Sequence, residues 1–205
     1  MPKMCFVCSM SDLFHEDVPF RFIAEVFTTM AMAQTRGHTF QVLTKRPHRL
    51  REFFDWNYPP GKMDPVVALK DWLACWPNVW LGTSCEDQER ADERTMRLLE
   101  TPAAVHFLSC EPLLGPLCPF EALCPSSDPG MLDWVIVGAE SGPRARPMKL
   151  DWARYIVQRC QERDVPVFVK QLCDDKGRKI PFEEWPEDLR VREWPKCVSV
   201  GVRNA

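Results

Sequence analysis

The sequence predicts an α/β fold with about six parallel strands. The apolar pattern of the 205-residue chain switches repeatedly between a short strand-like run and a longer helix-like run, as in successive β–α units. The strand-like runs are continuously apolar, as in Trp134 to Gly138, which is typical of strands covered on both faces. Such strands form either an open doubly wound sheet or part of a (β/α) barrel, and periodicity alone leaves both architectures open.

The first half of the chain is predicted to contain three strands separated by helices. Asp17 and Pro19 are the expected N-cap and first-turn proline of a helix that ends at Gly37. Pro47 opens a short helix, residues 57–63 are a loop, and a further helix is expected over residues 66–76. The strands are Met4–Ser9, Thr39–Thr44 and Val79–Thr83, and the apolar stripe of the first helix comprises Phe22, Ile23, Val26, Phe27 and Met30.

The second half continues the alternation. The charged stretch Asp87–Glu100 predicts a solvated helix, and the Pro-rich stretch 112–129 predicts a long loop. Asp151 is the expected cap of the last helix. The strands are Val105–Ser109, Trp134–Gly138 and Val165–Val169; the expected buried helix residues are Ala91, Met96, Leu98 and Leu99, followed by Trp152, Tyr155, Ile156 and Cys160 in the last helix.

Composition predicts one domain over residues 1–205, with a polar tail, residues 174–205, that wraps around it. The net charge of -3 excludes a strong global attraction to nucleic acid or an anionic membrane, although local basic clusters can still bind phosphate. No apolar run approaches the roughly 20 residues that span a bilayer, and no signal peptide is recognisable. We therefore expect a cytoplasmic protein without a membrane partner.

The ten cysteines predict buried, reduced thiols rather than disulfides. Cys5 and Cys8 have the C-x-x-C spacing, but an offset of three in a strand points two side chains to opposite faces. No second C-x-x-C accompanies them, so structural zinc is the weaker interpretation and no metal site is predicted.

Polar side chains follow the predicted strands. In either architecture ligands bind at the carboxyl ends of parallel strands, so these residues are the candidate ligand-binding set, without an assigned catalytic residue. The set comprises Ser9, Ser11, Asp12, Lys45, Arg46, Glu86, Glu111, Glu140, Arg144 and Lys170.

The carboxyl ends of the strands together form the predicted mouth of the fold. Glu86, Glu111 and Glu140 at this mouth can act as acid or base, hold a divalent ion or bind polar ligand groups. The alternative for each is a helix cap or a salt bridge with a neighbouring lysine or arginine. Arg144, with Arg146, is either a clamp for phosphate or carboxylate or a solvated loop charge.

Two histidines are further candidates for ligand or acid–base roles. His15 lies in the first β–α loop near the predicted mouth, whereas His38 precedes a strand and belongs to the opposite end. The sequence contains no G-x-G-x-x-G, Walker A or G-x-S-x-G motif, so nucleotide-fold and hydrolase assignments lack their usual support.

Several uninterrupted strings make the chain resemble the phage protein family known as domain of unknown function 5131, whose members are similar to radical SAM enzymes. The resemblance implies an incomplete TIM-type (β/α) barrel. The strings are SMSDLFHEDVP from Ser9, TFQVLTKRP from Thr39, VWLGTSCE from Val79, SCEPLLGP from Ser109, WVIVGAESGPR from Trp134, VFVKQL from Val167 and WPEDLRVREW from Trp185.

The same resemblance carries an expectation about cofactors. Family members have, before the SMSDLF string, a Cys-rich segment that would supply thiolates to a [4Fe-4S] cluster. Only eight residues precede Ser9 here, so we expect the segment to be missing and no cluster to form. No cofactor is therefore predicted, and S-adenosylmethionine belongs only to an alternative function.

Two functions follow as expectations. The first is a cluster-less phage protein that binds a macromolecular partner, including inhibition of a host defence or nucleic-acid machine, or that self-associates through an exposed first strand. The alternative is an enzyme whose strand-end mouth binds a nucleotide or S-adenosylmethionine in order to modify a nucleotide or nucleic acid. The tail stretch from Trp185 to Trp194 is a candidate cover for the first strand.

Overall fold

A computed structural model describes residues 3–8, 10–57, 76–120 and 132–195. Ser9, most of the helix predicted over residues 66–76 and part of the predicted Pro-rich loop lie outside these ranges. The strands are β1 (Met4–Val7), β2 (Thr39–Thr44), β3 (Val79–Ser84), β4 (His106–Cys110), β5 (Trp134–Gly138) and β6 (Val167–Gln171); the α-helices are α1 (Phe20–Met32), α2 (Pro47–Asn57), α4 (Gln88–Leu99) and α5 (Leu150–Gln161).

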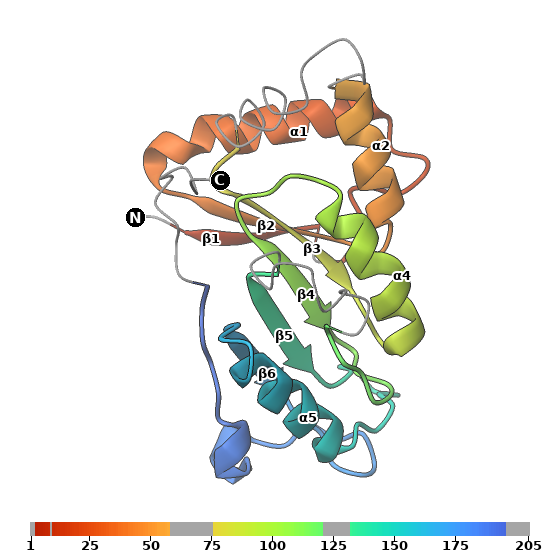
Figure 1. The fold of residues 1–205 in the computed structure, drawn as a ribbon, viewed down its shortest axis with the longest axis vertical. Helices are drawn as coiled ribbons and strands as arrows, with labels where there is room; N and C mark the ends of the chain where they lie inside the picture. The colour runs from red at the N-terminus through yellow and green to blue at the C-terminus, as the bar shows by residue number, and fades with distance from the viewer. Residues whose placement is uncertain (1–2, 9, 58–75, 121–131, 196–205) are drawn as a thin grey trace.

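The six strands form one parallel sheet in the order β1-β2-β3-β4-β5-β6, and the sheet curls into a half-barrel (Figure 1). Each strand pairs with the next one in the sequence, with partners such as Val42 opposite Leu81 and Leu108 opposite Val135. This confirms the predicted α/β class and is consistent with an incomplete (β/α) barrel. All the carboxyl ends of the strands therefore lie along one edge of the sheet.

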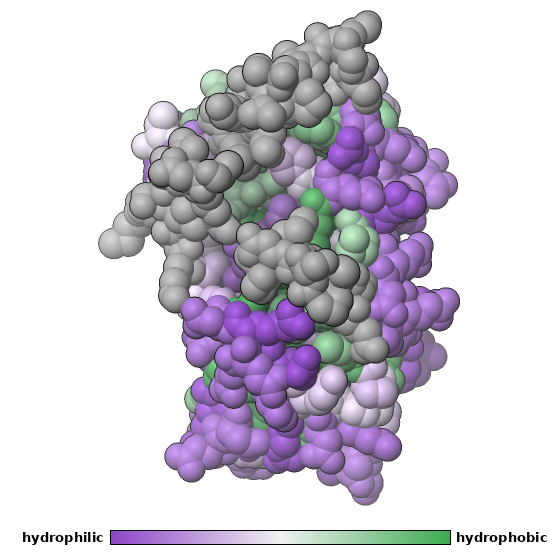
Figure 2. Space-filling model, in the orientation of Figure 1, coloured by the Kyte–Doolittle hydropathy of each residue, from purple (hydrophilic) through white to green (hydrophobic). Residues whose placement is uncertain are grey.

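The outer face of the sheet packs against the helices. Alternate strand residues such as Val42, Leu81 and Val135 belong to one buried cluster with the apolar stripes of α1, α2, α4 and α5. Under α1 and α2, Phe14, Phe27 and Phe53 contact one another in edge and tilted geometries, as aromatic rings prefer. In the view of Figure 2, hydrophilic residues cover the side on which α2 and α4 lie, and hydrophobic residues show in smaller patches.

The inner face carries a second, separate apolar cluster. Its buried members are Trp80, Val105, Phe107, Trp134 and Ile136, with Leu43 and Phe168 packed against them. These residues alternate along the strands with those of the outer face, because successive strand side chains point to opposite sides. The concave side is therefore filled by aromatic rings, as the interior of a small barrel is.

Two helix caps differ from the predictions. Pro19, not Asp17, is the N-cap of α1, and Lys149, not Asp151, is the N-cap of α5, so Asp151 lies in the first helical turn. The cap of α4 is side-chain mediated: Asp87 accepts a hydrogen bond from the Arg90 amide at 3.0 Å.

The buried stripe of α4 is also slightly rotated from the predicted one. Met96 is 45 % exposed whereas Thr95 is buried. Tyr155 of α5, predicted as buried, is 44 % exposed. Phe22 of α1, predicted on the apolar stripe, is also 52 % exposed. Apolar type alone misplaced these three residues, since long apolar side chains can lie along a solvated helix flank.

The C-terminal segment covers the last strand rather than the first. Beyond β6 the chain turns back, and Val169 donates to the Val191 carbonyl while Glu193 donates to the Val167 carbonyl, both at 2.9 Å. Trp194 then stacks on Trp134 with ring centroids 5.0 Å apart. The suggestion that Trp185 to Trp194 covers the first strand is wrong, because this stretch occupies the β6 edge.

No helix among the described residues is long and apolar enough to cross a membrane.

Candidate functional site

Four charged side chains stand at the carboxyl edge of the sheet, above the inner aromatic cluster. Lys45, Glu86 and Glu111 follow β2, β3 and β4, and Lys170 is near the end of β6. Counting back by two from each residue leads to an inner-face neighbour, for example from Lys170 to Phe168. We call Lys45, Glu86, Glu111 and Lys170 the charged layer; along the sheet its charges run positive, negative, negative, positive.

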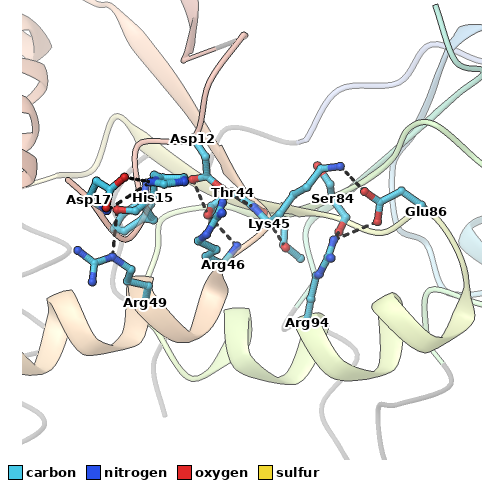
Figure 3. Close-up of polar contacts among 12 residues, drawn as sticks. Asp12, His15, Asp17, Thr44, Lys45, Arg46, Arg49, Ser84, Glu86 and Arg94 are labelled. Atoms are coloured by element: carbon cyan, nitrogen blue, oxygen red, sulfur yellow. Dashed lines mark hydrogen bonds and ion pairs between the residues drawn. The ribbon is translucent and has the colours of Figure 1, made fainter.

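One end of the charged layer is a three-residue ion network. The Lys45 ammonium lies 2.5 Å from one carboxylate oxygen of Glu86, and Arg94 of α4 lies 3.0 Å from the other (Figure 3). Arg94 also donates to the Ser84 carbonyl at 2.7 Å. The Glu86 side chain is only 12 % exposed, whereas that of Lys45 is 54 % exposed. The cation is therefore accessible and the carboxylate is recessed.

The protonation of Glu86 follows from this network. Burial acts to raise the pKa of the carboxyl, but the hydrogen bond from Lys45 and the charges of Lys45 and Arg94 outweigh burial and hold the pKa below its ordinary value. Glu86 is therefore a carboxylate at neutral pH, suited to binding a cationic group rather than to donating a proton.

The other end of the charged layer depends on a glycine. The Lys170 ammonium reaches the Glu111 carboxylate at 2.9 Å, although β5 lies between their strands. The intervening inner-face position is Gly138, where a β-carbon would stand 3.1 Å from the carboxyl carbon of Glu111. The missing side chain thus leaves the space in which Glu111 and Lys170 meet. The Glu111 side chain is 19 % exposed and the Lys170 side chain is 55 % exposed. As in the Lys45–Glu86 pair, the carboxylate is recessed and the cation is accessible.

Glu140 forms a separate clamp beside the charged layer. Its two oxygens accept from the Arg146 guanidinium at 2.7 and 2.9 Å, and one of them also accepts from the Arg146 amide. These hydrogen bonds lower the pKa of Glu140 to about 2. The pKa of Arg146 is raised, first by its hydrogen bond to Glu140.

Asp12 and Arg46 join the first loop to the end of β2. The Asp12 carboxylate accepts from the Phe14 amide, the Thr44 hydroxyl, the Lys45 amide and Arg46, at 2.8–3.1 Å (Figure 3). Four donors occupy both oxygens, so Asp12 fixes the loop and the base of Lys45. Its contribution to a ligand is indirect.

The remaining candidates are more peripheral. Ser11 and Arg144 are exposed, and Ser9 lies outside the described residues. His15 accepts from the Asp17 amide beside Arg49, while His38 accepts from the Lys3 amide before β2 begins, which is the opposite end of the strand. The sequence missed Arg94 because it lies on a charged helix and its partner is Glu86, which is eight residues away.

Three of the described cysteines are buried thiols that are unsuited to a reactive role. Burial raises the pKa of the Cys85 thiol to about 12 and raises those of Cys110 and Cys160 above their ordinary value. Within residues 3–8, 10–57, 76–120 and 132–195, no three Cys, His, Asp or Glu side chains converge as a metal site. The described residues therefore offer no set of three thiolates for the iron–sulfur cluster that the family resemblance implies.

The family model described as Protein of unknown function (DUF5131) matches residues 1–193. The chain belongs to this family. The DUF5131 match covers all six strands, the charged layer, the Glu140–Arg146 clamp and the segment that lines β6. No curated protein and no solved structure matches the chain at a significant level.

Proposed function

We propose that the carboxyl edge of the half-barrel binds a zwitterionic nucleoside of the S-adenosylmethionine class, as a step in modifying a nucleotide or nucleic acid. The observation that carries this proposal is the charged layer, in which a recessed carboxylate and an accessible lysine stand together at each end. Of the two functions expected from the sequence, the geometry favours the one that uses this mouth.

A ligand with an α-amino acid group matches the charges of the charged layer. Its ammonium can take the place of a lysine on Glu86 or Glu111, and its carboxylate can take the place of a glutamate on Lys45 or Lys170. Each exchange leaves every buried charge with a partner, which avoids the cost of an unpaired ion. A purely anionic ligand would instead have to face two recessed carboxylates.

The surroundings of the charged layer suit the rest of such a ligand. Ile136 and Phe168 precede Gly138 and Lys170 by two residues, so strand alternation places them on the same inner face. Binding sites typically combine an apolar floor with a few polar groups that fix the ligand's orientation. The paired charges supply that orientation, and the apolar floor supplies contact area for the carbon chain that joins the amino acid group to the sulfur.

Calorimetric titration with S-adenosylmethionine, S-adenosylhomocysteine and adenosine tests this proposal. We expect the two amino-acid-bearing ligands to bind and adenosine to bind at least about tenfold more weakly, because tenfold is about 1.4 kcal/mol and each lost charged contact contributes on that scale. Glu86→Gln and Lys170→Met should each weaken the two binding ligands by about tenfold.

The matched control is Arg97→Met, which breaks an exposed ion pair with Glu100 on α4 and should leave affinity unchanged. Adenosine binding as tightly as S-adenosylmethionine, or equal losses in the control and the site variants, would overturn the proposal.

A second candidate function is association through β1, and a separate observation favours it. β1 is the first strand of the sheet, and Met4 and Phe6 are 46 % and 43 % exposed. Exposed edge strands pair readily with another chain. We propose that a second copy of this chain pairs with β1. The alternative partner at the same strand is a host macromolecule, as expected from the resemblance to phage proteins.

Light scattering over a range of protein concentrations tests the second candidate. We expect a mass above that of the 23.8 kDa chain at high concentration, and a return to that mass in Phe6→Lys. Phe22→Lys, at a position 52 % exposed on α1, is the matched control and should still associate. A wild-type protein that stays monomeric throughout rules out self-association.

A further inference from the structure

A pocket of about 320 Å³ opens between the loop after β5 and the turn after β6. One wall is made of residues 140–143 with Ala145, and the other of Gln171, Leu172 and residues 176–179. None of the four residues of the charged layer lines the pocket, whereas Glu140 of the neighbouring clamp does. The pocket is therefore a distinct feature of the carboxyl edge.

Backbone contact and one carboxylate hold the pocket in shape. Gly177 has a φ of 76°, and a β-carbon there would lie 2.1 Å from the Ala145 carbonyl oxygen, so the two loops touch directly. Asp174 accepts from the amides of Lys176 and Arg178 and from the Arg178 guanidinium, at 2.7–2.9 Å. Hydrogen bonds within the turn therefore fix its shape.

The charges around the pocket leave an excess of cations. Of the lining and adjoining carboxylates, Glu140 is paired with Arg146 and Asp174 with Arg178, which leaves Asp175 beside Lys176. Lys176 and Lys179 line the same space, and the described part of the chain gives neither ammonium an ion pair. These two lysines outnumber the one further carboxylate, Asp175, so the pocket is locally cationic in a chain whose net charge is -3.

We propose that this pocket binds a phosphate group, borne either by a free nucleotide or by a nucleic-acid strand. Lys176 and Lys179 supply the charge, and the Ser141 hydroxyl is a further donor on the lining. A pocket of this volume accepts the phosphate with part of its sugar, since small-molecule sites begin at about 300 Å³. The inference rests on different residues from the zwitterion site and stands or fails separately from it.

Titrations with adenosine monophosphate and with a single-stranded oligonucleotide, followed by fluorescence anisotropy or calorimetry, separate the two sources. Binding of the monophosphate assigns a nucleotide pocket, and binding of the oligonucleotide alone assigns a strand contact. In either case Lys176→Gln/Lys179→Gln should weaken binding at least about tenfold. For the oligonucleotide, the slope of log affinity against log salt concentration should also fall by the amount expected for about two lost phosphate contacts.

The matched control is Arg21→Gln/Arg36→Gln, which removes the same charge from α1 and the turn after it, away from the pocket. It should leave affinity within about twofold, because the lost charges are exposed and distant. Equal weakening in both double variants would show a non-specific charge effect, and failure of both ligands to bind at millimolar concentration would also overturn the proposal. Unchanged S-adenosylmethionine binding in Lys176→Gln/Lys179→Gln distinguishes this site from the charged layer.

Discussion

Trp134→Ala is expected to lower the free energy of unfolding by about 3–5 kcal/mol, the range observed when a large buried aromatic residue is truncated. Trp134 is 2 % exposed and contacts the rings of Trp80, Phe107 and Trp194. Its indole nitrogen donates to the Glu193 carbonyl at 2.9 Å, so truncation also leaves that carbonyl unpaired. The substitution removes the centre of the inner cluster.

Urea denaturation followed by circular dichroism measures this loss. Trp194→Ala is the graded control, because the Trp194 ring is 50 % exposed and should cost clearly less than the loss of Trp134. A loss below about 1 kcal/mol for Trp134→Ala would show that the concave face is not a packed core.

Gly138→Val is expected to reduce S-adenosylmethionine affinity by about a hundredfold, or about 2.8 kcal/mol, with the fold retained. A β-carbon at Gly138 would lie 3.1–3.3 Å from three atoms of the Glu111 side chain, and the two further methyl groups of valine would fill the gap that Glu111 crosses to reach Lys170. Valine suits a strand, so the effect should fall on the charged layer rather than on the sheet.

The comparison set for this prediction is Gly138→Ala and Gly115→Ala. The first should have a smaller effect than valine, since only one atom enters the gap. The second adds a β-carbon whose nearest neighbour is Asp87 at 3.8 Å, an ordinary contact, and should leave affinity unchanged. Retained affinity in Gly138→Val would separate ligand binding from the Glu111–Lys170 pair.

Local sequence patterns predicted much of the sheet. The boundaries of β2 and β5 agree with the predicted runs, because a strand covered on both faces is apolar throughout and stops where its burial stops. Patterns were weaker on the helices. Met96 was expected inside and Thr95 is buried instead, because the buried stripe of α4 depends on how the helix is rotated against the sheet.

The site was predictable as a location but not as a set of contacts. Strand ends of a parallel sheet share one edge, which places Lys45, Glu86, Glu111 and Lys170 together once the strands are assigned. The choice of partners is non-local: Glu111 and Lys170 are 59 residues apart, and their contact depends on the missing side chain of Gly138. Nothing in the sequence around either residue encodes that gap.

A crystal structure of the protein grown with saturating S-adenosylmethionine tests the central claim most directly. We expect the amino acid group of the ligand to lie at the carboxyl edge. Its ammonium should bind Glu86 or Glu111 and its carboxylate should bind Lys45 or Lys170, at hydrogen-bonding distances of about 2.7–3.2 Å. A ligand bound elsewhere, or an unliganded charged layer with both ion pairs intact, would contradict it.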